Sequence, residues 1–305
     1  MLFVPGNSTR FIHSSLKLPT DAIILDLEDS CPMPDKSMGR TLIRDSLDQL
    51  GSAGFEVWVR PNGTSTGLLE ADLDAVVRKG LCGILLPKVE DPKEVVTLED
   101  MLNERERKNG VVQGSIAVIP TIESAKGSLN VLEICTASKR NVGVGFGAAD
   151  YLRDFGRDAV EISKEGTEVL YTRSRIAIAA RIKGILAIDT VFFGLITDEE
   201  GLRRESKMVL QLGFNGKFVI HPKQIGPVNE VFSPASKDID HAKRVIEAFN
   251  EAQNRGLGAT ILDGRLIDIA FVNLAKNTLA MADAIMEKER KRKEEVPAEK
   301  VTQAS

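Results

Sequence analysis

Ser115-Ile-Ala-Val-Ile-Pro-Thr-Ile-Glu123 and Asn141-Val-Gly-Val-Gly-Phe-Gly-Ala-Ala-Asp150 are the stretches of sequence that decide the fold. Each is an apolar run of the kind found in buried strands, and each ends in a carboxylate that precedes a helix-like segment. Neighbouring parallel strands lie about 4.8 Å apart, so Glu123 and Asp150 at their carboxyl ends would be within reach of one cation. Hard oxygen ligands favour Mg²⁺, or alternatively Mn²⁺. The competing interpretation is that each carboxylate caps the helix that follows it.

The same alternation of a short apolar run and a helical pattern occurs eight times in the first 232 residues. Alternation at this spacing is typical of parallel strands. Eight such units in about 250 residues predict a closed (β/α)8 TIM barrel, an α/β fold. An open doubly wound sheet is the alternative, but no GxGxxG loop follows the first strand. The expected strands are residues 2–4, 22–27, 56–60, 83–88, 115–120, 141–146, 189–193 and 217–221.

The helical pattern is clearest over residues 164–186, where Ile178, Ile182 and Ile185 recur at helical spacing and predict one apolar face. The pattern changes near Ser233, where the barrel units end. We therefore expect three regions. They are a catalytic TIM barrel over residues 1–232, a C-terminal helical extension over 233–290 and a disordered tail over 291–305.

Within the extension, the sequence predicts helices over residues 238–255 and 268–289. The segment between them, residues 259–267, is expected to form a hairpin with Asp263-Gly264 at its turn.

The composition argues against several classes of protein. The formal net charge of −4 and the low aromatic content of 5% argue against a nucleic-acid-binding protein. The three cysteines are widely spaced and odd in number, which predicts a reducing compartment and no disulfide framework. No apolar run approaches the roughly 20 residues needed to cross a membrane. The N-terminus lacks the pattern of a signal peptide. We expect a cytoplasmic protein or, if a leader is missing, one of the mitochondrial matrix.

Active sites of such barrels form at the carboxyl ends of the strands, where this sequence gathers polar residues. Arg60 could hold a substrate carboxylate and stabilise a developing oxyanion, or it could pair with Glu28 or Asp29. The glycines around Gly147 permit close approach of a ligand to the backbone, or simply a tight turn. The residues at these strand ends are Glu28, Asp29, Arg60, Lys88, Glu123, Asp150 and His221.

Two of these residues have structural interpretations that we favour. Lys88 could be a Schiff-base nucleophile. A structural ion pair is the better hypothesis, because the carboxylates already indicate a metal-dependent site. His221-Pro222 is expected to end the last strand.

Motifs occur in a fixed order along nearly the whole chain. They are Phe3-Val-Pro-Gly6, Ile24-Leu-Asp-Leu-Glu-Asp-Ser30, Leu86-Pro-Lys88, Ile119-Pro-Thr-Ile-Glu-Ser-Ala125, Gly145-Phe-Gly-Ala-Ala-Asp-Tyr151, Lys217-Phe-Val-Ile-His-Pro-Lys-Gln224 and Gly264-Arg-Leu-Ile-Asp268. Together they resemble the citrate lyase beta subunit-like proteins of the HpcH/HpaI aldolase superfamily. That group includes malyl-CoA and citramalyl-CoA lyases and related malate synthase or thioesterase enzymes.

The resemblance implies a TIM barrel whose C-terminal extension acts as a lid on a neighbouring subunit, in a homotrimer or a dimer of trimers. It implies that Glu123 and Asp150 bind Mg²⁺ and that Glu28 or Asp29 supports the waters of the metal. It also implies that Asp268, from the extension, is catalytic in a neighbouring subunit. On the sequence alone, Asp268 could instead cap the helix that it precedes.

The resemblance further implies how the substrate is held. Arg60 would contact the keto acid and act in catalysis, and the backbone from Gly147 through Ala149 to Asp150 would bind the carboxylate of the keto acid.

The function implied is a Mg²⁺-dependent carbon–carbon lyase. It would reversibly cleave a β-hydroxyacyl-CoA such as citramalyl-CoA or malyl-CoA into acetyl-CoA and a 2-keto acid, pyruvate or glyoxylate. Three alternatives stay open. They are a malate synthase or malyl-CoA thioesterase that uses the same site, the beta subunit of a citrate lyase that acts on a citryl carrier protein, and a non-catalytic protein that binds CoA thioesters.

Overall fold

A computed structural model describes residues 1–157 and 162–295. The chain divides into two compact units, residues 1–228 and 229–305. The division falls inside α10, four residues before the boundary at residue 232 that the sequence led us to expect.

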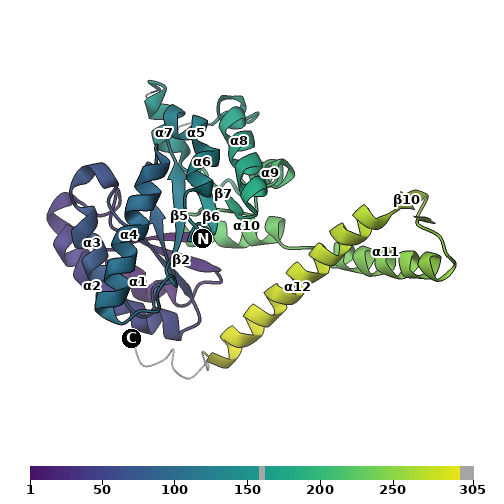
Figure 1. The fold of residues 1–305 in the computed structure, drawn as a ribbon, viewed down its shortest axis with the longest axis horizontal. Helices are drawn as coiled ribbons and strands as arrows, with labels where there is room; N and C mark the ends of the chain where they lie inside the picture. The colour runs from purple at the N-terminus through teal and green to yellow at the C-terminus, as the bar shows by residue number, and fades with distance from the viewer. Residues whose placement is uncertain (158–161, 296–305) are drawn as a thin grey trace. The chain divides into compact units, whose positions relative to one another are not determined.

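The first unit contains eight parallel strands that neighbour one another in chain order from β1 to β8. Val219, just after β8, forms a parallel bridge with Leu2 of β1 and so brings the last strand against the first. Helices surround the strands (Figure 1), and the predicted TIM-barrel fold is confirmed. The strands are β1 (Leu2–Pro5), β2 (Ala22–Asp26), β3 (Glu56–Arg60), β4 (Gly83–Leu86), β5 (Ala117–Ile122), β6 (Gly143–Phe146), β7 (Leu186–Asp189) and β8 (Gly216–Lys217).

The helices of this unit follow the strands in alternation. They are α1 (Thr9–Ser15), α2 (Lys36–Ser52), α3 (Leu69–Val76), α4 (Pro92–Asn109), α5 (Ala125–Leu129), α6 (Val131–Thr136), α7 (Ala148–Asp154), α8 (Thr167–Lys183), α9 (Glu199–Leu212) and α10 (Ile225–Phe232).

The strands are buried on both faces, as a parallel sheet covered by helices requires. All five residues of β2 are buried. Alternate side chains of the strands form one apolar cluster, which includes Ile24, Trp58 and Phe218. Because the parallel register pairs Asp26 at the end of β2 with Arg60 at the end of β3, it brings charged side chains together at the carboxyl ends.

The predicted apolar face of α8 is wrong. Ile178 and Ile182 are 61% and 63% exposed, whereas Arg173, Ile176 and Ala180 are buried. The spacing of the isoleucines misled because the buried face carries a charged residue, and its partner is distant in the sequence.

That partner is Asp189, which ends β7 instead of beginning a strand as predicted. Its carboxylate is 2.8 Å from Arg173 Nε and 2.6 Å from Lys217 Nζ. All three side chains are completely buried.

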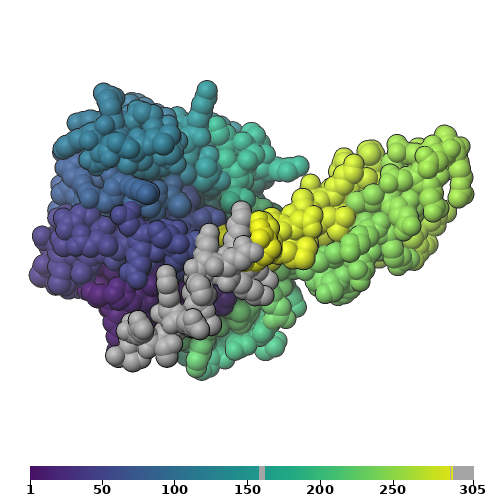
Figure 2. All heavy atoms as spheres, turned by 90° about the horizontal axis from the view of Figure 1, so that it is seen from below, coloured from purple at the N-terminus to yellow at the C-terminus, as the bar shows by residue number. Residues whose placement is uncertain are grey.

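The second unit is a pair of helices, α11 (Ser236–Asn254) and α12 (Ile269–Glu295), joined by the antiparallel strands β9 (Thr260–Leu262) and β10 (Arg265–Ile267). The helices lie against each other (Figures 1 and 2) through an apolar cluster that includes Val245, Phe249 and Val272. Asp263 and Gly264 have φ angles of 49° and 77°, so the predicted Asp-Gly turn is confirmed.

The expected tail, residues 291–305, begins inside α12, which continues to Glu295, and residues 296–305 lie outside the described residues. None of the three cysteines forms a disulfide, as predicted. Within the described parts of the chain, no helix is long and apolar enough to cross a membrane.

The buried ion cluster gives a prediction about stability. Replacing Asp189 with Asn leaves Arg173 and Lys217 buried with too little negative charge, and should lower the free energy of unfolding by about 3–5 kcal/mol. Urea denaturation followed by circular dichroism measures this change. Glu199→Gln is the control, because it removes an exposed pair with Arg203 and should change stability by less than about 1 kcal/mol. Equal, small effects of the two substitutions on the free energy of unfolding would contradict the conclusion that the buried ion cluster stabilises the fold.

Candidate active site

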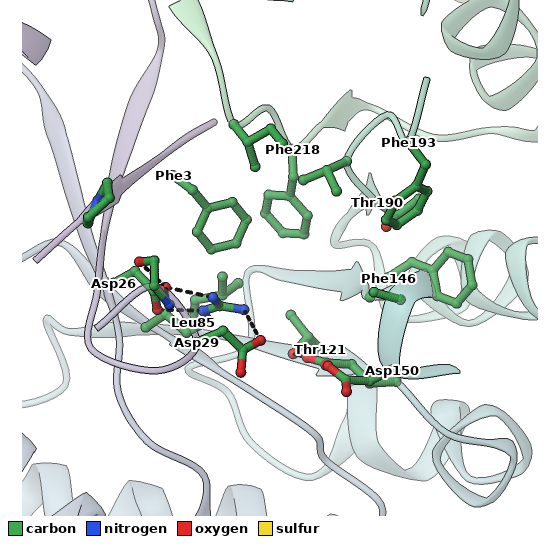
Figure 3. Close-up of a pocket in the computed structure, with 18 residues that line it drawn as sticks. Phe3, Asp26, Asp29, Leu85, Thr121, Phe146, Asp150, Thr190, Phe193 and Phe218 are labelled. Carbon is green, nitrogen blue, oxygen red and sulfur yellow. Dashed lines mark hydrogen bonds and ion pairs between the residues drawn. The ribbon is translucent and has the colours of Figure 1, made fainter. Parts of the chain in front are cut away.

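A cavity of about 400 Å³ opens at the carboxyl ends of the barrel strands (Figure 3). Its lining includes most of the predicted site residues. The charged or hydroxylated lining residues are Asp26, Asp29, Ser30, Arg60, Thr121, Glu123, Asp150 and Thr190. The apolar lining residues are Phe3, Pro5, Leu85, Phe146, Gly147, Ala149, Val191, Phe193, Phe218 and Ile220.

Arg60 is held by a partner that the sequence reasoning missed. Its Nε and Nη2 groups each donate to the Asp26 carboxylate at 2.7 Å, and its guanidinium lies over the Phe3 ring at 4.7 Å. Burial acts to raise the pKa of Asp26, but the charge and hydrogen bonds of Arg60 outweigh it and hold that pKa below its ordinary value. The pairing of Asp26 with Arg60 in the sheet register was the available signal for this contact.

Arg60 also forms the ion pairs that we considered as its structural alternative. Its Nη1 lies 3.0 Å from Glu28 Oε2 and 3.8 Å from Asp29 Oδ2. Glu28 is buried, and burial raises the pKa of its carboxyl group despite Arg60. Arg60 is therefore fixed on one side by Asp26 and directed on the other toward the carboxylates of the loop that follows β2.

Glu123 is buried beneath the cavity, with 6% of its surface exposed. Its Oε1 accepts a hydrogen bond from the Thr121 hydroxyl at 2.6 Å and another from the Lys88 backbone N–H at 3.3 Å. A Cβ atom at Gly147 would lie 2.6 Å from Glu123 Cγ, so residue 147 must be glycine for Glu123 to occupy this place. Burial, followed by repulsion from Glu28, raises the pKa of Glu123 to about 8.

Asp150 lies in the first turn of α7, the helix that follows β6, and β6 is the strand next to β5 in the barrel. Its carboxylate accepts from Arg153 Nη1 at 2.6 Å and lies 3.7 Å from Lys88 Nζ.

Neither Glu123 nor Asp150 caps the helix that follows it. Ser124 caps α5 by accepting from the Gly127 N–H, and α7 begins at Gly147 without a side-chain cap. The helix-cap interpretation of the two carboxylates is therefore wrong.

Lys88 forms an ion pair, as we favoured. Its Nζ lies 2.7 Å from Glu28 Oε1 and 3.6 Å from Asp29 Oδ1. Burial acts to lower the pKa of Lys88, but the hydrogen bond and charge of Glu28 outweigh it and raise that pKa above its ordinary value. His221 accepts a hydrogen bond from the Lys223 N–H and so caps the turn after the last strand.

The carboxylate oxygens in the cavity suit a metal cation that takes few of its ligands from the protein. Within residues 1–157 and 162–295, no group of three or more His, Cys, Asp and Glu side chains is placed to hold a metal. Mg²⁺ keeps several waters and is commonly bound through one or two carboxylates. Glu123 and Asp150 supply that number, and the described residues make their hydrogen bonds to Glu123 through Oε1, which leaves Oε2 for a cation.

Asp268 lies in the second unit, where its Oδ1 accepts from the backbone N–H groups of Ala270 and Phe271 at 2.9 and 3.3 Å. Asp268 therefore caps the start of α12, which is the structural role that the sequence left open for it. Its reach into a neighbouring subunit stays a prediction, because the two units are described separately.

Comparison with known proteins gives the family. A model of the HpcH/HpaI aldolase/citrate lyase family matches residues 1–222. The chain belongs to this family. Citrate lyase subunit beta of Leuconostoc mesenteroides subsp. cremoris is 37% identical over 284 residues, which cover 93% of each chain. The mitochondrial citramalyl-CoA lyase of Homo sapiens is 35% identical over 298 residues, which cover 94% of this chain and 86% of that protein.

A solved structure has a similar fold. The protein CitE from Mycobacterium tuberculosis, in complex with magnesium, acetoacetate and coenzyme A, has a TM-score of 0.73 and 28% identity. The match covers 92% of this chain and 97% of that one. These findings confirm the resemblance and the prediction of an enzyme of the lyase class, and they support CoA-related lyase chemistry.

The raised pKa of Glu123 predicts how pH affects the metal-free protein. The folded protein keeps this proton up to about pH 8, whereas a glutamate in the unfolded chain releases it near 4.5. Between these values the folded state binds more protons, so this group's effect is to lower stability as pH rises. The melting temperature of EDTA-treated protein should therefore fall across this window. The fall in melting temperature should be smaller in Glu123→Gln. An equal fall with pH in the two proteins would contradict the raised pKa of Glu123.

Proposed function

We propose that this protein is a Mg²⁺-dependent carbon–carbon lyase. It reversibly cleaves a β-hydroxyacyl-CoA thioester, citramalyl-CoA or malyl-CoA, into acetyl-CoA and a small 2-keto acid, pyruvate or glyoxylate. The observation that carries the proposal is the convergence of Glu123, Asp150 and Arg60 on one cavity that has an apolar wall.

Glu123 and Asp150 hold the metal in this proposal. When bound, Mg²⁺ supplies a Lewis acid for the substrate oxygen that changes from hydroxyl to carbonyl. Glu28 and Asp29 lie beside them and would accept hydrogen bonds from the waters of the metal.

Arg60 stabilises negative charge on the same substrate oxygen. The Asp26 carboxylate accepts from Nε and Nη2 and so fixes the plane of the guanidinium. Nη1, which lies 3.0 Å from Glu28 Oε2, points toward the loop carboxylates and would donate its other N–H to the substrate. The aromatic ring of Phe3 limits access of water to this cation.

The carboxylate of the keto acid binds at the start of α7. The first N–H groups of a helix have no partner within the helix. Ala148 N–H donates to Thr190 Oγ1 at 3.1 Å, which leaves the N–H groups of Ala149 and Asp150 for the substrate. Gly147 permits the close approach, because its Cβ-free backbone faces Glu123.

The apolar wall favours a keto acid with one carboxylate. Arg60 is the only cationic side chain among the described residues that line the cavity. Val191, Phe193 and Phe218 form part of the remaining wall, which would leave a second substrate carboxylate desolvated and unpaired. This supports pyruvate or glyoxylate as the keto acid over a citryl group, which would give a keto acid with two carboxylates.

Asp268 provides the proton transfer at carbon. Asp268 would take the hydroxyl proton as the Cα–Cβ bond breaks, and the electron pair of that bond would pass to the enolate of acetyl-CoA while the hydroxyl-bearing carbon becomes the carbonyl of the keto acid. Asp268, from the extension of a neighbouring subunit in a homotrimer or a dimer of trimers, then protonates the enolate carbon. In the condensation direction it removes the same proton.

The proposal predicts metal-dependent release of keto acid. Purified protein should release pyruvate from citramalyl-CoA or glyoxylate from malyl-CoA with Mg²⁺, and EDTA should abolish the reaction. Asp268→Ala and Glu123→Gln should each lower kcat/KM by about 100-fold or more, because a proton-transfer group or a metal ligand is lost. Asp263→Ala is the matched control for Asp268, since it removes an exposed aspartate from the same unit.

Other results of this assay would contradict the proposed lyase function. Free CoA without keto-acid release, formed from acetyl-CoA and glyoxylate, would indicate a malate synthase or thioesterase. Activity only on a citryl carrier protein would indicate a citrate lyase subunit. Binding of the thioesters without turnover in any assay would indicate a non-catalytic binding protein.

Asp26 should affect activity by holding Arg60 and the loop after β2, since its carboxylate also accepts from the Glu28 and Ser30 backbone N–H groups at 2.9 and 3.0 Å. Asp26→Asn keeps the shape of the side chain but loses the charge that holds the guanidinium, so kcat/KM should fall by about 10- to 100-fold. Steady-state kinetics alongside circular dichroism separates this effect from unfolding. Full activity of a folded Asp26→Asn variant would show that Arg60 does not need this anchor.

A further inference from the structure

Lys88 has an unusual backbone conformation. Its φ of 55° lies in the left-handed region, and Asp263 is the only other non-glycine residue with positive φ in residues 1–157 and 162–295. Asp263 belongs to an Asp-Gly turn, where this conformation is favoured. Lysine gains nothing comparable from its own side chain, so the surrounding structure must impose the conformation.

This conformation lets one residue contact carboxylates from three parts of the barrel. The backbone N–H of Lys88 donates to Glu123 at the end of β5. The ammonium group contacts Glu28 after β2, at 2.7 Å, and Asp150 in α7, at 3.7 Å. Lys88 itself follows β4, so it links strand ends that are not all adjacent in the sheet.

The charge balance of the cavity makes this cation important. Asp26 takes two hydrogen bonds from Arg60 and so balances most of that charge. Glu28, Asp29 and Asp150 all lie within 4 Å of the Lys88 ammonium group, and carboxylates gathered this closely repel one another unless a cation lies between them. Of the described cations, Lys88 is the one that contacts Glu28, Asp29 and Asp150 together.

We propose that Lys88 is a positioning residue that serves as an internal counter-ion. It holds the site carboxylates in place when no metal is bound, and it lowers the affinity of the same carboxylates for Mg²⁺. This inference rests on the proposed Mg²⁺ site at Glu123 and Asp150. Its consequence is a metal ion that exchanges readily, at a site that stays assembled without it.

The contacts of Lys88 argue against its use as a Schiff-base nucleophile. A nucleophilic amine must lose its proton. Close contact with Glu28 favours the protonated ammonium group instead, and the side chain is not among the residues that line the cavity. The counter-ion role uses the charge that these contacts stabilise.

The test measures the stability of the metal-free protein, which should fall, and its affinity for Mg²⁺, which should rise. Lys88→Gln removes the charge, so the melting temperature of EDTA-treated protein should fall by about 2–4 °C. Without the repelling ammonium group, the dissociation constant for Mg²⁺, measured by calorimetry, should decrease by about three- to tenfold. Lys88→Arg keeps the charge and should resemble the wild type. Lys126→Gln, which breaks an exposed pair with Glu90, controls for loss of a lysine elsewhere.

A second variant separates charge from backbone strain. Lys88→Gly removes the ammonium group but adopts the left-handed conformation without cost, so it should fold even if Lys88→Gln does not. It should show the same tightening of Mg²⁺ binding.

The outcomes distinguish this inference from the proposed function. Wild-type protein that binds no Mg²⁺ would contradict both. Wild-type binding, with unchanged or weaker binding by both neutral variants, would contradict the counter-ion role alone, since loss of a purely structural contact would weaken the site. Tighter binding with lower metal-free stability in Lys88→Gln would support it.

Discussion

Repulsion among carboxylates confined at the carboxyl end of the barrel is the constraint on which this site depends. Glu28 and Glu123 are buried there, and Asp150 and Asp29 lie beside them. Asp26 already balances Arg60 through two hydrogen bonds, so the negative charge that remains must be met by another cation. The raised pKa of Glu123 is one expression of this imbalance, and the three carboxylate contacts of Lys88 are another. A bound Mg²⁺ would resolve both.

The barrel creates this arrangement through its register. Pairing of Asp26 with Arg60 across β2 and β3 sets their side chains at the same level, and the order of the strands brings Glu123 and Asp150 to adjoining positions. Gly147 completes the geometry, because any larger residue would collide with Glu123. Changes that shift one strand by a residue would therefore separate the charges as well as expose the core.

The sequence predicted what depends on local patterns. The alternation of strands and helices, the Asp-Gly turn at residues 263–264, and the meeting of Glu123 with Asp150 at one cavity all follow from short motifs. It did not predict features that depend on partners distant in the chain. Arg173 is buried on α8 because it pairs with Asp189 at the end of β7, and this reversed the expected face of the helix. Asp26 lies in the strand that the sequence predicted, but its contact with Arg60 follows only from the sheet register.

The central claim is that Glu123 and Asp150 share one divalent cation. The most direct measurement is a crystal structure of the protein with Mn²⁺ and pyruvate, with the metal located by its anomalous scattering. The account predicts one strong peak within coordination distance of both carboxylates, with Arg60 beside the keto oxygen. A peak elsewhere, or none at saturating Mn²⁺ with Lys88 still bridging Glu28 and Asp150, would contradict it.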